Sequence, residues 1–170
     1  KRSTTIDKIV DAIFQIQGGY ALVMLTQTSL IGVRDPYGIR PLVIGKLGGS
    51  YVLASETCAL DIIGAKFIRE VENGEIVLIE KDELKSIKPF PPKKVRPCVF
   101  EYIYFSRPDS LLDNKTAYEH RKNLGKELAK ENDINADIVV PVPDSGNAAA
   151  LGFSQILKIN FEHGLIRNHY

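Results

Sequence analysis

Apolar positions change their spacing within the first 84 residues, from a helical stripe to the short runs that are typical of strands. Ile6, Ile9, Val10, Ile13 and Phe14 recur at helical intervals, which predicts a helix that ends at Gly18-Gly19. Short apolar runs between turn residues then predict strands over residues 20–25, 30–33, 42–45, 51–54, 68–71 and 75–79. This order predicts an antiparallel sheet with helices packed on it.

Three local patterns refine the interpretation of this half. Asn73-Gly74 lies between two of the predicted strands and predicts a hairpin turn. Ser55 is expected to cap a short helix that runs to Ile63. The run at 20–25 is nearly all apolar, which is typical of a strand covered on both faces.

The composition changes at residue 85. Residues 85–97 contain four prolines and five cations, which predicts an extended linker. Beyond it lie an aromatic stretch at 99–105 whose rings alternate as on strand faces, a helix at 116–130, a strand at 137–142 and a helix at 147–157. That order predicts a parallel α/β domain. The expected organisation is therefore a domain over 1–84, a linker over 85–97 and a second domain over 98–170.

Composition and charge exclude several classes of function for these 170 residues. The formal net charge is +1, which argues against a nucleic-acid partner. No apolar run approaches the roughly 18 residues that a membrane-spanning helix needs, so no membrane partner is expected. The two cysteines are too few for a disulfide framework, and a reducing cytoplasm is the expected location.

The turn at residues 143–146 is the most informative candidate site. It follows a predicted strand and precedes a predicted helix, where α/β proteins bind ligands. A helix N-terminus there favours an anion, the Ser145 hydroxyl can hold Mg²⁺, and Gly146 allows a phosphate to approach the backbone. A plain helix cap, with Asp144 and Ser145 as ordinary cap and turn residues, is the alternative that this pattern leaves open.

Other reactive residues have simpler explanations. Arg34 and Arg40 flank a Pro/Gly turn, where they could bind a carboxylate or phosphate or hold the loop through ion pairs. Cys58 and Cys98 are best explained as buried thiols, because one cysteine cannot complete a metal site. The histidines show no ligand spacing; they are His120, His163 and His169.

Seven strings, in order along nearly the whole chain, resemble the family of glutamine phosphoribosylpyrophosphate amidotransferases. They include RDPYGIRPL at 34–42, PCVFEYIYFSRPDS at 97–110 and VPVPDS at 140–145, and the others lie at 19–21, 54–61, 69–75 and 164–170. The stretch 100–110 is highly specific. The resemblance implies an α+β and α/β protein. Part of an Ntn-hydrolase αββα sandwich is expected first, followed by the start of a phosphoribosyltransferase parallel-sheet domain.

The resemblance also implies an activity and a set of site residues. Family members convert glutamine, phosphoribosylpyrophosphate and water into 5-phosphoribosylamine, glutamate and pyrophosphate, the first committed step of purine synthesis. Asp144, Ser145 and Gly146 match the family's substrate turn, in which Ser145 is a magnesium ligand. Cys98 matches the first ligand of the 4Fe-4S cluster that some members carry. A homo-oligomer is expected, and His169 stands where the family has a basic Arg.

The family's catalytic groups are not among these residues. Its glutaminase nucleophile is an amino-terminal cysteine, whereas this chain begins at Lys1. We therefore expect an internal piece of the enzyme that is inactive by itself. A non-catalytic binding or scaffold protein that keeps the same shape is the alternative. We also expect the second half to be looser than residues 6–79, because apolar surface near residues 138–142 would be uncovered.

Overall fold

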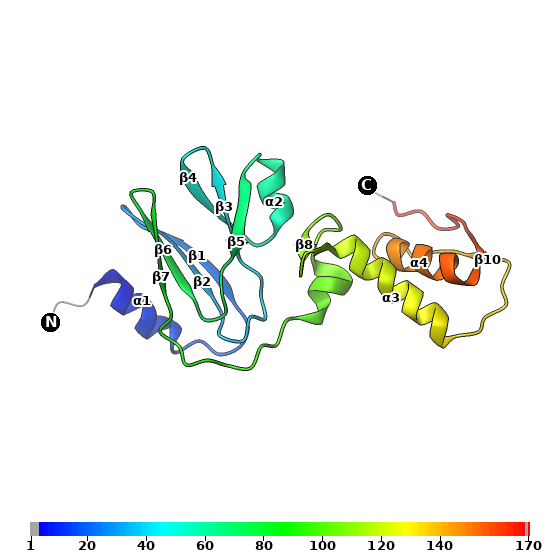
Figure 1. Cartoon of the computed structure of the whole chain (residues 1–170), viewed down its shortest axis with the longest axis horizontal. Helices are drawn as coiled ribbons and strands as arrows, with labels where there is room; N and C mark the ends of the chain where they lie inside the picture. Colours follow the sequence, from blue (N-terminus) through cyan, green and yellow to red (C-terminus); the bar gives the residue numbers. More distant parts are fainter. Residues whose placement is uncertain (1–3, 169) are drawn as a thin grey trace. The chain divides into compact units, whose positions relative to one another are not determined.

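The computed structural model describes residues 4–168 and 170, and the chain divides into two compact units, Lys1–Cys98 and Val99–Tyr170 (Figure 1). The first unit contains α1 (Thr5–Ile13), β1 (Ala21–Leu25), β2 (Leu30–Arg34), β3 (Val43–Leu47), β4 (Ser50–Ala54), α2 (Thr57–Ile62), β5 (Lys66–Glu70), β6 (Ile76–Glu80) and β7 (Glu83–Ile87). Its strands form a four-stranded sheet in the order β1-β2-β6-β7 and a three-stranded sheet in the order β4-β3-β5.

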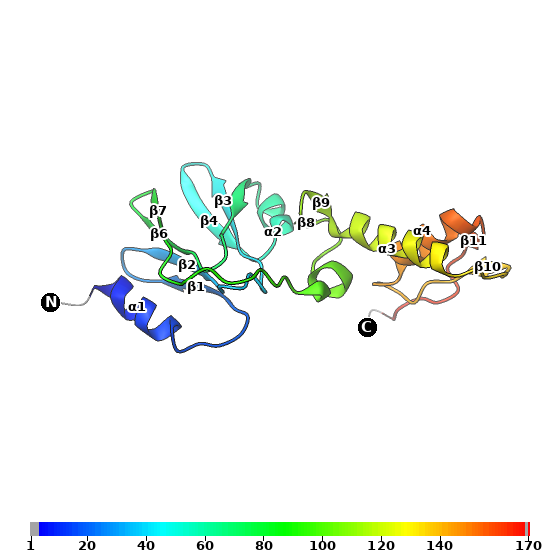
Figure 2. The ribbon, with the colours of Figure 1, turned by 60° about the horizontal axis from the view of Figure 1, so that its bottom comes forward.

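The first unit has four layers, with one helix outside each sheet (Figure 2). Helix α1 packs through Ile13 on Ile31 and Ile76 of the four-stranded sheet. Ile44 and Val77 meet in the core between the two sheets. Leu60 of α2 covers the other face of the three-stranded sheet. This αββα arrangement confirms the sandwich that the resemblance implied.

Alternation along the strands explains why both faces of a sheet are buried. Val43 contacts α2, whereas its neighbour Ile44 contacts the opposite sheet. Gly45 returns to the α2 side, where a Cβ atom would lie 2.7 Å from the Leu60 side chain. A larger residue at Gly45 would push the helix away from the sheet. The close packing of α2 on β3 therefore depends on this glycine.

The predicted Asn73-Gly74 hairpin is wrong in its pairing. β5 pairs with β3, for example Ile44 with Arg69, whereas β6 pairs with β2 in the other sheet. The turn is real, since Gly74 has a φ of +71°, but it carries the chain from one sheet to the other. The Glu75 carboxylate accepts the Glu72 amide at 2.6 Å, so side-chain bonding takes the place of a hairpin ladder.

Three further expectations for this unit need correction. The N-cap residue of helix α2 is Glu56 rather than Ser55, and no side chain makes a capping hydrogen bond there. β1 is an edge strand with one uncovered face, because Val23 is 52% and Leu25 82% exposed. The predicted linker begins too early, since β7 pairs with β6 as far as Ile87.

The second unit contains a π-helical turn η1 (Glu101–Phe105), β8 (Leu111–Leu112), β9 (Lys115–Thr116), α3 (Ala117–Glu131), β10 (Ile138–Val139), α4 (Asn147–Leu157) and β11 (Asn160–Phe161). β10 precedes α4 in the sequence and β11 follows it. The two strands pair in parallel, as expected for an α/β unit. The aromatic stretch is helical rather than a strand. Arg121 of α3 holds it by donating to the carbonyls of Tyr102 at 2.9 Å and Ser106 at 2.7 Å.

Helices α3 and α4 cross closely at two glycines. A Cβ atom at Gly125 would lie 1.8 Å from the Ala149 carbonyl oxygen, and one at Gly152 would lie 2.0 Å from that of Lys122. α3 begins at the predicted capping box, in which Thr116 and Glu119 bond each other's backbone amides.

Within the described residues, no helix is both long and apolar enough to span a bilayer.

Candidate functional site

The turn at 143–146 connects β10 to α4 by a tight backbone path. The Gly146 amide donates to the Val142 carbonyl at 3.1 Å, and the Asn147 amide donates to that of Asp144 at 3.3 Å. A Cβ atom at Gly146 would lie 2.6 Å from the Val142 oxygen, so the turn requires glycine. Gly146 itself is the N-cap of α4, and no side chain caps the helix. The exposed side chains of Asp144 and Ser145 are therefore not used as caps.

Arginine side chains surround this turn. An open cavity of about 640 Å³ lies against it, lined by Tyr104, Phe105, Ser106, Arg107, Pro108, Arg121, Pro143, Asp144, Ser145 and Arg167. Three of these residues are cationic and one, Asp144, is acidic. Arg167 pairs with Asp144 at 3.3 Å and Arg107 with Asp109 at 2.8 Å, while Arg121 is buried. The excess of positive charge suits an anionic ligand.

Sequence reasoning missed most of this cavity. It singled out the residues of the turn, but Arg107 and Arg121 lie more than twenty positions earlier in the chain. The only signal for Arg107 was its place in the family string at 97–110. The tertiary packing of η1 and α3 brings these arginines to the turn.

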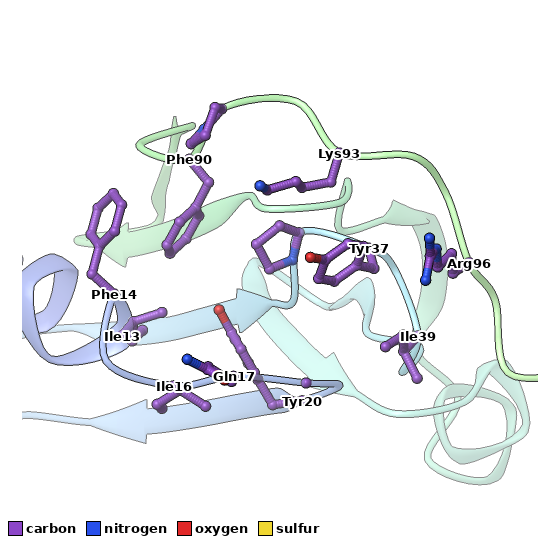
Figure 3. A pocket seen from close by; sticks show the side chains of 13 residues that line it. Ile13, Phe14, Ile16, Gln17, Tyr20, Tyr37, Ile39, Phe90, Lys93 and Arg96 are labelled. Atoms are coloured by element: carbon purple, nitrogen blue, oxygen red, sulfur yellow. The ribbon is translucent and has the colours of Figure 1, made fainter.

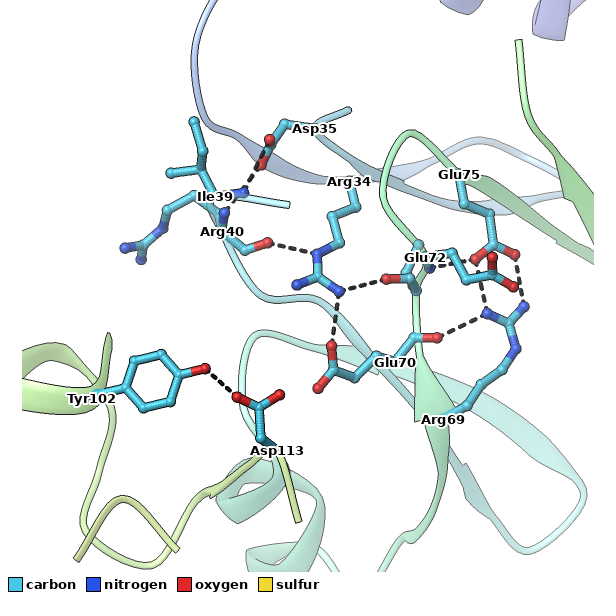
Figure 4. Close-up of polar contacts among 11 residues, drawn as sticks. Arg34, Asp35, Ile39, Arg40, Arg69, Glu70, Glu72, Glu75, Tyr102 and Asp113 are labelled. Carbon is cyan, nitrogen blue, oxygen red and sulfur yellow. Dashed lines mark hydrogen bonds and ion pairs between the residues drawn. The ribbon is translucent and has the colours of Figure 1, made fainter. Parts of the chain in front are cut away.

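The loop after β2 is organised by one buried carboxylate, Asp35 (Figure 4). Its two oxygens accept the backbone amides of Tyr37 at 3.0 Å, Ile39 at 3.1 Å and Arg40 at 3.0 Å. The amide of Tyr20 lies at 3.4 Å from the same carboxylate. Asp35 thus satisfies backbone donors in a turn where Pro36 and Gly38 prevent regular structure.

Arg34 fits the ion-pair interpretation of the same loop. Its guanidinium donates to the Arg40 carbonyl at 2.9 Å, the Glu70 carboxylate at 2.8 Å and the Val71 carbonyl at 2.7 Å. Its side chain is only 12% exposed. These bonds tie the loop after β2 to the end of β5, and they leave Arg34 in a structural role.

A second ion pair stabilises the segment in which the chain crosses from β5 in one sheet to β6 in the other (Figure 4). Arg69 donates to both oxygens of the buried Glu75 carboxylate, at 2.7 and 2.8 Å. Burial acts to raise the pKa of Glu75, but the bonds from Arg69 and from the Glu72 amide outweigh it and hold that pKa below its usual value. The bond to Glu75 in turn raises the pKa of Arg69. The pair is charged at neutral pH.

The metal roles expected for Ser145 and Cys98 stay predictions. Among residues 4–168 and 170, no three His, Cys, Asp or Glu side chains lie together as metal ligands. Cys98 is half-buried and its amide donates to the Ile39 carbonyl at 3.3 Å; Cys58 is buried in α2. Ser145 and Asp144 offer fewer oxygens than Mg²⁺ requires, so these residues fit the ion only with ligands from a bound phosphate.

The histidines make contacts of a structural kind. The rings of His120 and Tyr102 form a T-shaped pair with their centres 5.0 Å apart, and His120 Nε2 lies 2.9 Å from the Leu112 carbonyl oxygen. The His163 ring packs against Phe161 at 5.1 Å. His169, the position that departs from the family pattern, lies outside the described residues.

Comparison with known proteins first defines a class. Residues 3–61 match the model of a glutamine amidotransferase domain, the region that builds α1, the first strands and α2. The chain is also 54% identical to an amidophosphoribosyltransferase of Rhizobium etli, over 100% of its own length and 35% of that enzyme. It is 46% identical to the Bacillus subtilis amidophosphoribosyltransferase, over 98% of this chain and 35% of the relative.

Solved structures agree with these relatives. The glutamine phosphoribosylpyrophosphate amidotransferase of B. subtilis, solved with ADP and GMP, matches with a TM-score of 0.95 and 45% identity over 99% of this chain and 37% of the other. A structure described as the allosteric regulatory enzyme of purine biosynthesis matches with a TM-score of 0.94. The chain therefore belongs to the amidophosphoribosyltransferase family, and it spans about a third of the length of these relatives.

Proposed function

We propose that this chain forms part of an amidophosphoribosyltransferase, and that its second unit holds the pyrophosphate group of phosphoribosylpyrophosphate. The observation that carries the proposal is the glycine-dependent turn at the N-terminus of α4, with Ser145 exposed in a cavity rich in arginine. The full-length enzyme would use glutamine as its nitrogen source and release glutamate and pyrophosphate. The identity to such enzymes along the whole chain supports this assignment.

The residues of the cavity have distinct parts in this proposal. The Ser145 hydroxyl binds phosphate oxygens near the positive N-terminal end of α4, and Arg107 and Arg167 balance their charge. Mg²⁺, when bound with pyrophosphate, neutralises charge on the leaving group, and Ser145 is one of its ligands. Arg121 keeps the η1 wall in place through its two carbonyl bonds.

The first unit supplies the body of the glutaminase half. Both cysteines of the chain are internal, at 58 and 98, so the 170 residues lack an amino-terminal cysteine nucleophile. We expect the isolated chain to bind magnesium pyrophosphate without releasing glutamate from glutamine. A homo-oligomer in a reducing cytoplasm is part of the same proposal, and the two free thiols are consistent with such a compartment.

Calorimetric titration of the 170-residue chain with magnesium pyrophosphate tests the proposal. Binding should weaken by about fivefold to tenfold in Ser145→Ala, since one hydrogen bond and one metal ligand are lost. Ser50→Ala, in an exposed strand of the first unit, is the matched control and should bind like the parent. The proposal fails if the parent shows no binding up to millimolar concentrations, or if the two variants weaken binding equally.

A further inference from the structure

A second cavity is lined only by residues of the first unit (Figure 3). Its volume is about 520 Å³, which falls within the range of small-molecule sites. Three segments enclose it: the end of α1 with the residues that follow, the turn at 36–39, and the extended segment 88–98, which we call the strap. The lining residues are Ile13, Phe14, Ile16, Gln17, Gly18, Tyr20, Pro36, Tyr37, Ile39, Phe90, Pro91, Lys93 and Arg96.

The strap forms an ordered wall of this cavity, although its composition predicted only a linker. The amide of Arg96 donates to the Tyr37 carbonyl at 2.8 Å, and that of Cys98 donates to the Ile39 carbonyl at 3.3 Å. The Arg96 guanidinium lies 5.8 Å from the centre of the Tyr37 ring. At the other end, the rings of Phe90 and Phe14 pack with their centres 4.8 Å apart. The cavity is therefore built by contacts at both ends of the strap.

Tyr20 places an unused polar group inside the cavity. The residue is only 8% exposed, and its hydroxyl points into the space between the strap and α1 (Figure 3). No hydrogen bond joins that hydroxyl to another residue within 4–168 and 170. The hydroxyl is not among the fully buried polar atoms that lack a partner, so it is open to the cavity, where a ligand acceptor can take its hydrogen bond. Burial, with the nearby Asp35 carboxylate, raises the pKa of Tyr20, so the phenol stays protonated and can donate.

The charge and shape of the lining define the ligand. Lys93 and Arg96 are the charged groups of the wall, and the residues that line the cavity include no carboxylate. Lys93 makes no ion pair with another residue in the described part of the chain, and in Figure 3 its side chain reaches over the cavity. Apart from Gln17 and Gly18, the remaining walls are aromatic rings, prolines and isoleucines. Such walls favour a flat apolar body.

We propose that this cavity binds a small, flat organic anion. The ring system of the ligand lies among Phe14, Tyr37 and Phe90, its anionic group meets Lys93 and Arg96, and an oxygen accepts the hydrogen of the Tyr20 hydroxyl. Because the strap supplies three of these groups, the ligand joins the strap to α1 and holds the wall closed. This site is separate from the proposed pyrophosphate turn and does not rest on that assignment.

The first experiment uses naphthoate as a flat aromatic anion and naphthamide as its neutral counterpart. Both are titrated into the 170-residue chain, labelled for amide NMR, and the shifted residues are mapped. Naphthoate should shift residues at 13–20, 36–39 and 90–96 and bind at least about fivefold more tightly than naphthamide, because one charge-assisted hydrogen bond is lost. Equal affinity for the two probes, shifts centred outside these segments, or no binding of naphthoate up to millimolar concentrations would each overturn the proposal.

Two variants test the named residues. Lys93→Gln removes the cation on the wall, and Lys94→Gln removes the neighbouring cation, which does not line the cavity. The first should weaken naphthoate binding about fivefold and the second by less than about twofold. Tyr20→Phe keeps the ring and removes the donor, so it should weaken naphthoate binding while thermal unfolding shows that the fold is kept. Equal effects of Lys93→Gln and Lys94→Gln would refute the assignment, as would full affinity in Tyr20→Phe.

Discussion

Two buried carboxylates account for much of the local structure in the first unit. The Asp35 carboxylate accepts hydrogen bonds from backbone amides of the turn that follows β2. The Glu75 carboxylate accepts them from Arg69 and the Glu72 amide, where the chain crosses between the sheets. Each is fully buried. Without these partners, either group would be an unsatisfied charge in the core. These hydrogen bonds give the strings at 34–42 and 69–75 a structural role.

Replacement of Glu75 tests this view at the scale of one residue. Glu75→Gln should reduce the free energy of unfolding at pH 7 by about 2 kcal/mol, because it removes a charged partner from Arg69. The pKa of Glu75 is lowered in the folded state, so its contribution is complete above the unfolded value of about 4.5 and is lost as the pH falls through the folded value. The difference between parent and variant should therefore shrink in acid.

Urea unfolding at a series of pH values measures both effects. Glu83→Gln, at an exposed position on β7, serves as the control and should be close to the parent throughout. A stability difference for Glu75→Gln that stays constant from pH 7 down to pH 3 would contradict the role given to the Arg69 pair.

At the scale of elements, close approach decides the packing of the second unit. α3 and α4 meet where Gly125 and Gly152 leave no room for a Cβ atom, so the backbones themselves are in contact. Helix propensity alone would disfavour glycine at both positions by about 1 kcal/mol relative to alanine. The two glycines are therefore explained by the crossing, which local propensity does not reveal.

Gly125→Ala separates these two effects by their sign. Propensity predicts a gain in stability, whereas the 1.8 Å approach to the Ala149 oxygen predicts a loss, and we expect the loss to prevail by about 2 kcal/mol. Amide exchange in α3 and α4 measures the change. Gly49→Ala is the control, since a Cβ atom there meets nothing within 4 Å. A slower exchange in Gly125→Ala would refute the packing argument.

At the scale of the whole molecule, the two units differ in how well they bury apolar surface. The first unit has three apolar clusters around two sheets. In the second, the only parallel sheet within the described residues has two strands, and Ile138 is 52% and Val142 71% exposed. Uncovered apolar residues beside a short strand pair weaken a fold and favour association.

We therefore expect the two units to open independently, with residues 99–168 exchanging their amide hydrogens faster than residues 6–79. Native-state hydrogen exchange, read separately for α3 and for β2, makes the comparison. Analytical ultracentrifugation should also show association that increases with concentration. Equal protection factors in β2 and α3 would rule out this difference between the units.

The sequence by itself located the four α-helices, although α1 ends at Ile13 rather than at Gly18-Gly19, and it gave most strand positions, the capped start of α3 and the family. These features depend on periodicity, capping residues and strings of neighbours in the chain. Only the tertiary structure decided which strands pair. It separated β5 and β6 into different sheets and turned the aromatic stretch at 101–105 into a helical turn. Pairing is set by which apolar faces meet across the core, and no local pattern records that.

The candidate sites divide in the same way. Ser145 and its turn could be found from the order strand, turn, helix, since that arrangement is local. The arginines around the turn, and the pair of Tyr20 and Lys93 that line the second cavity, come from segments far apart in the chain. Long-range packing brought them together, because burying the apolar faces of η1, α1 and Phe90 also fixed where their polar neighbours lie.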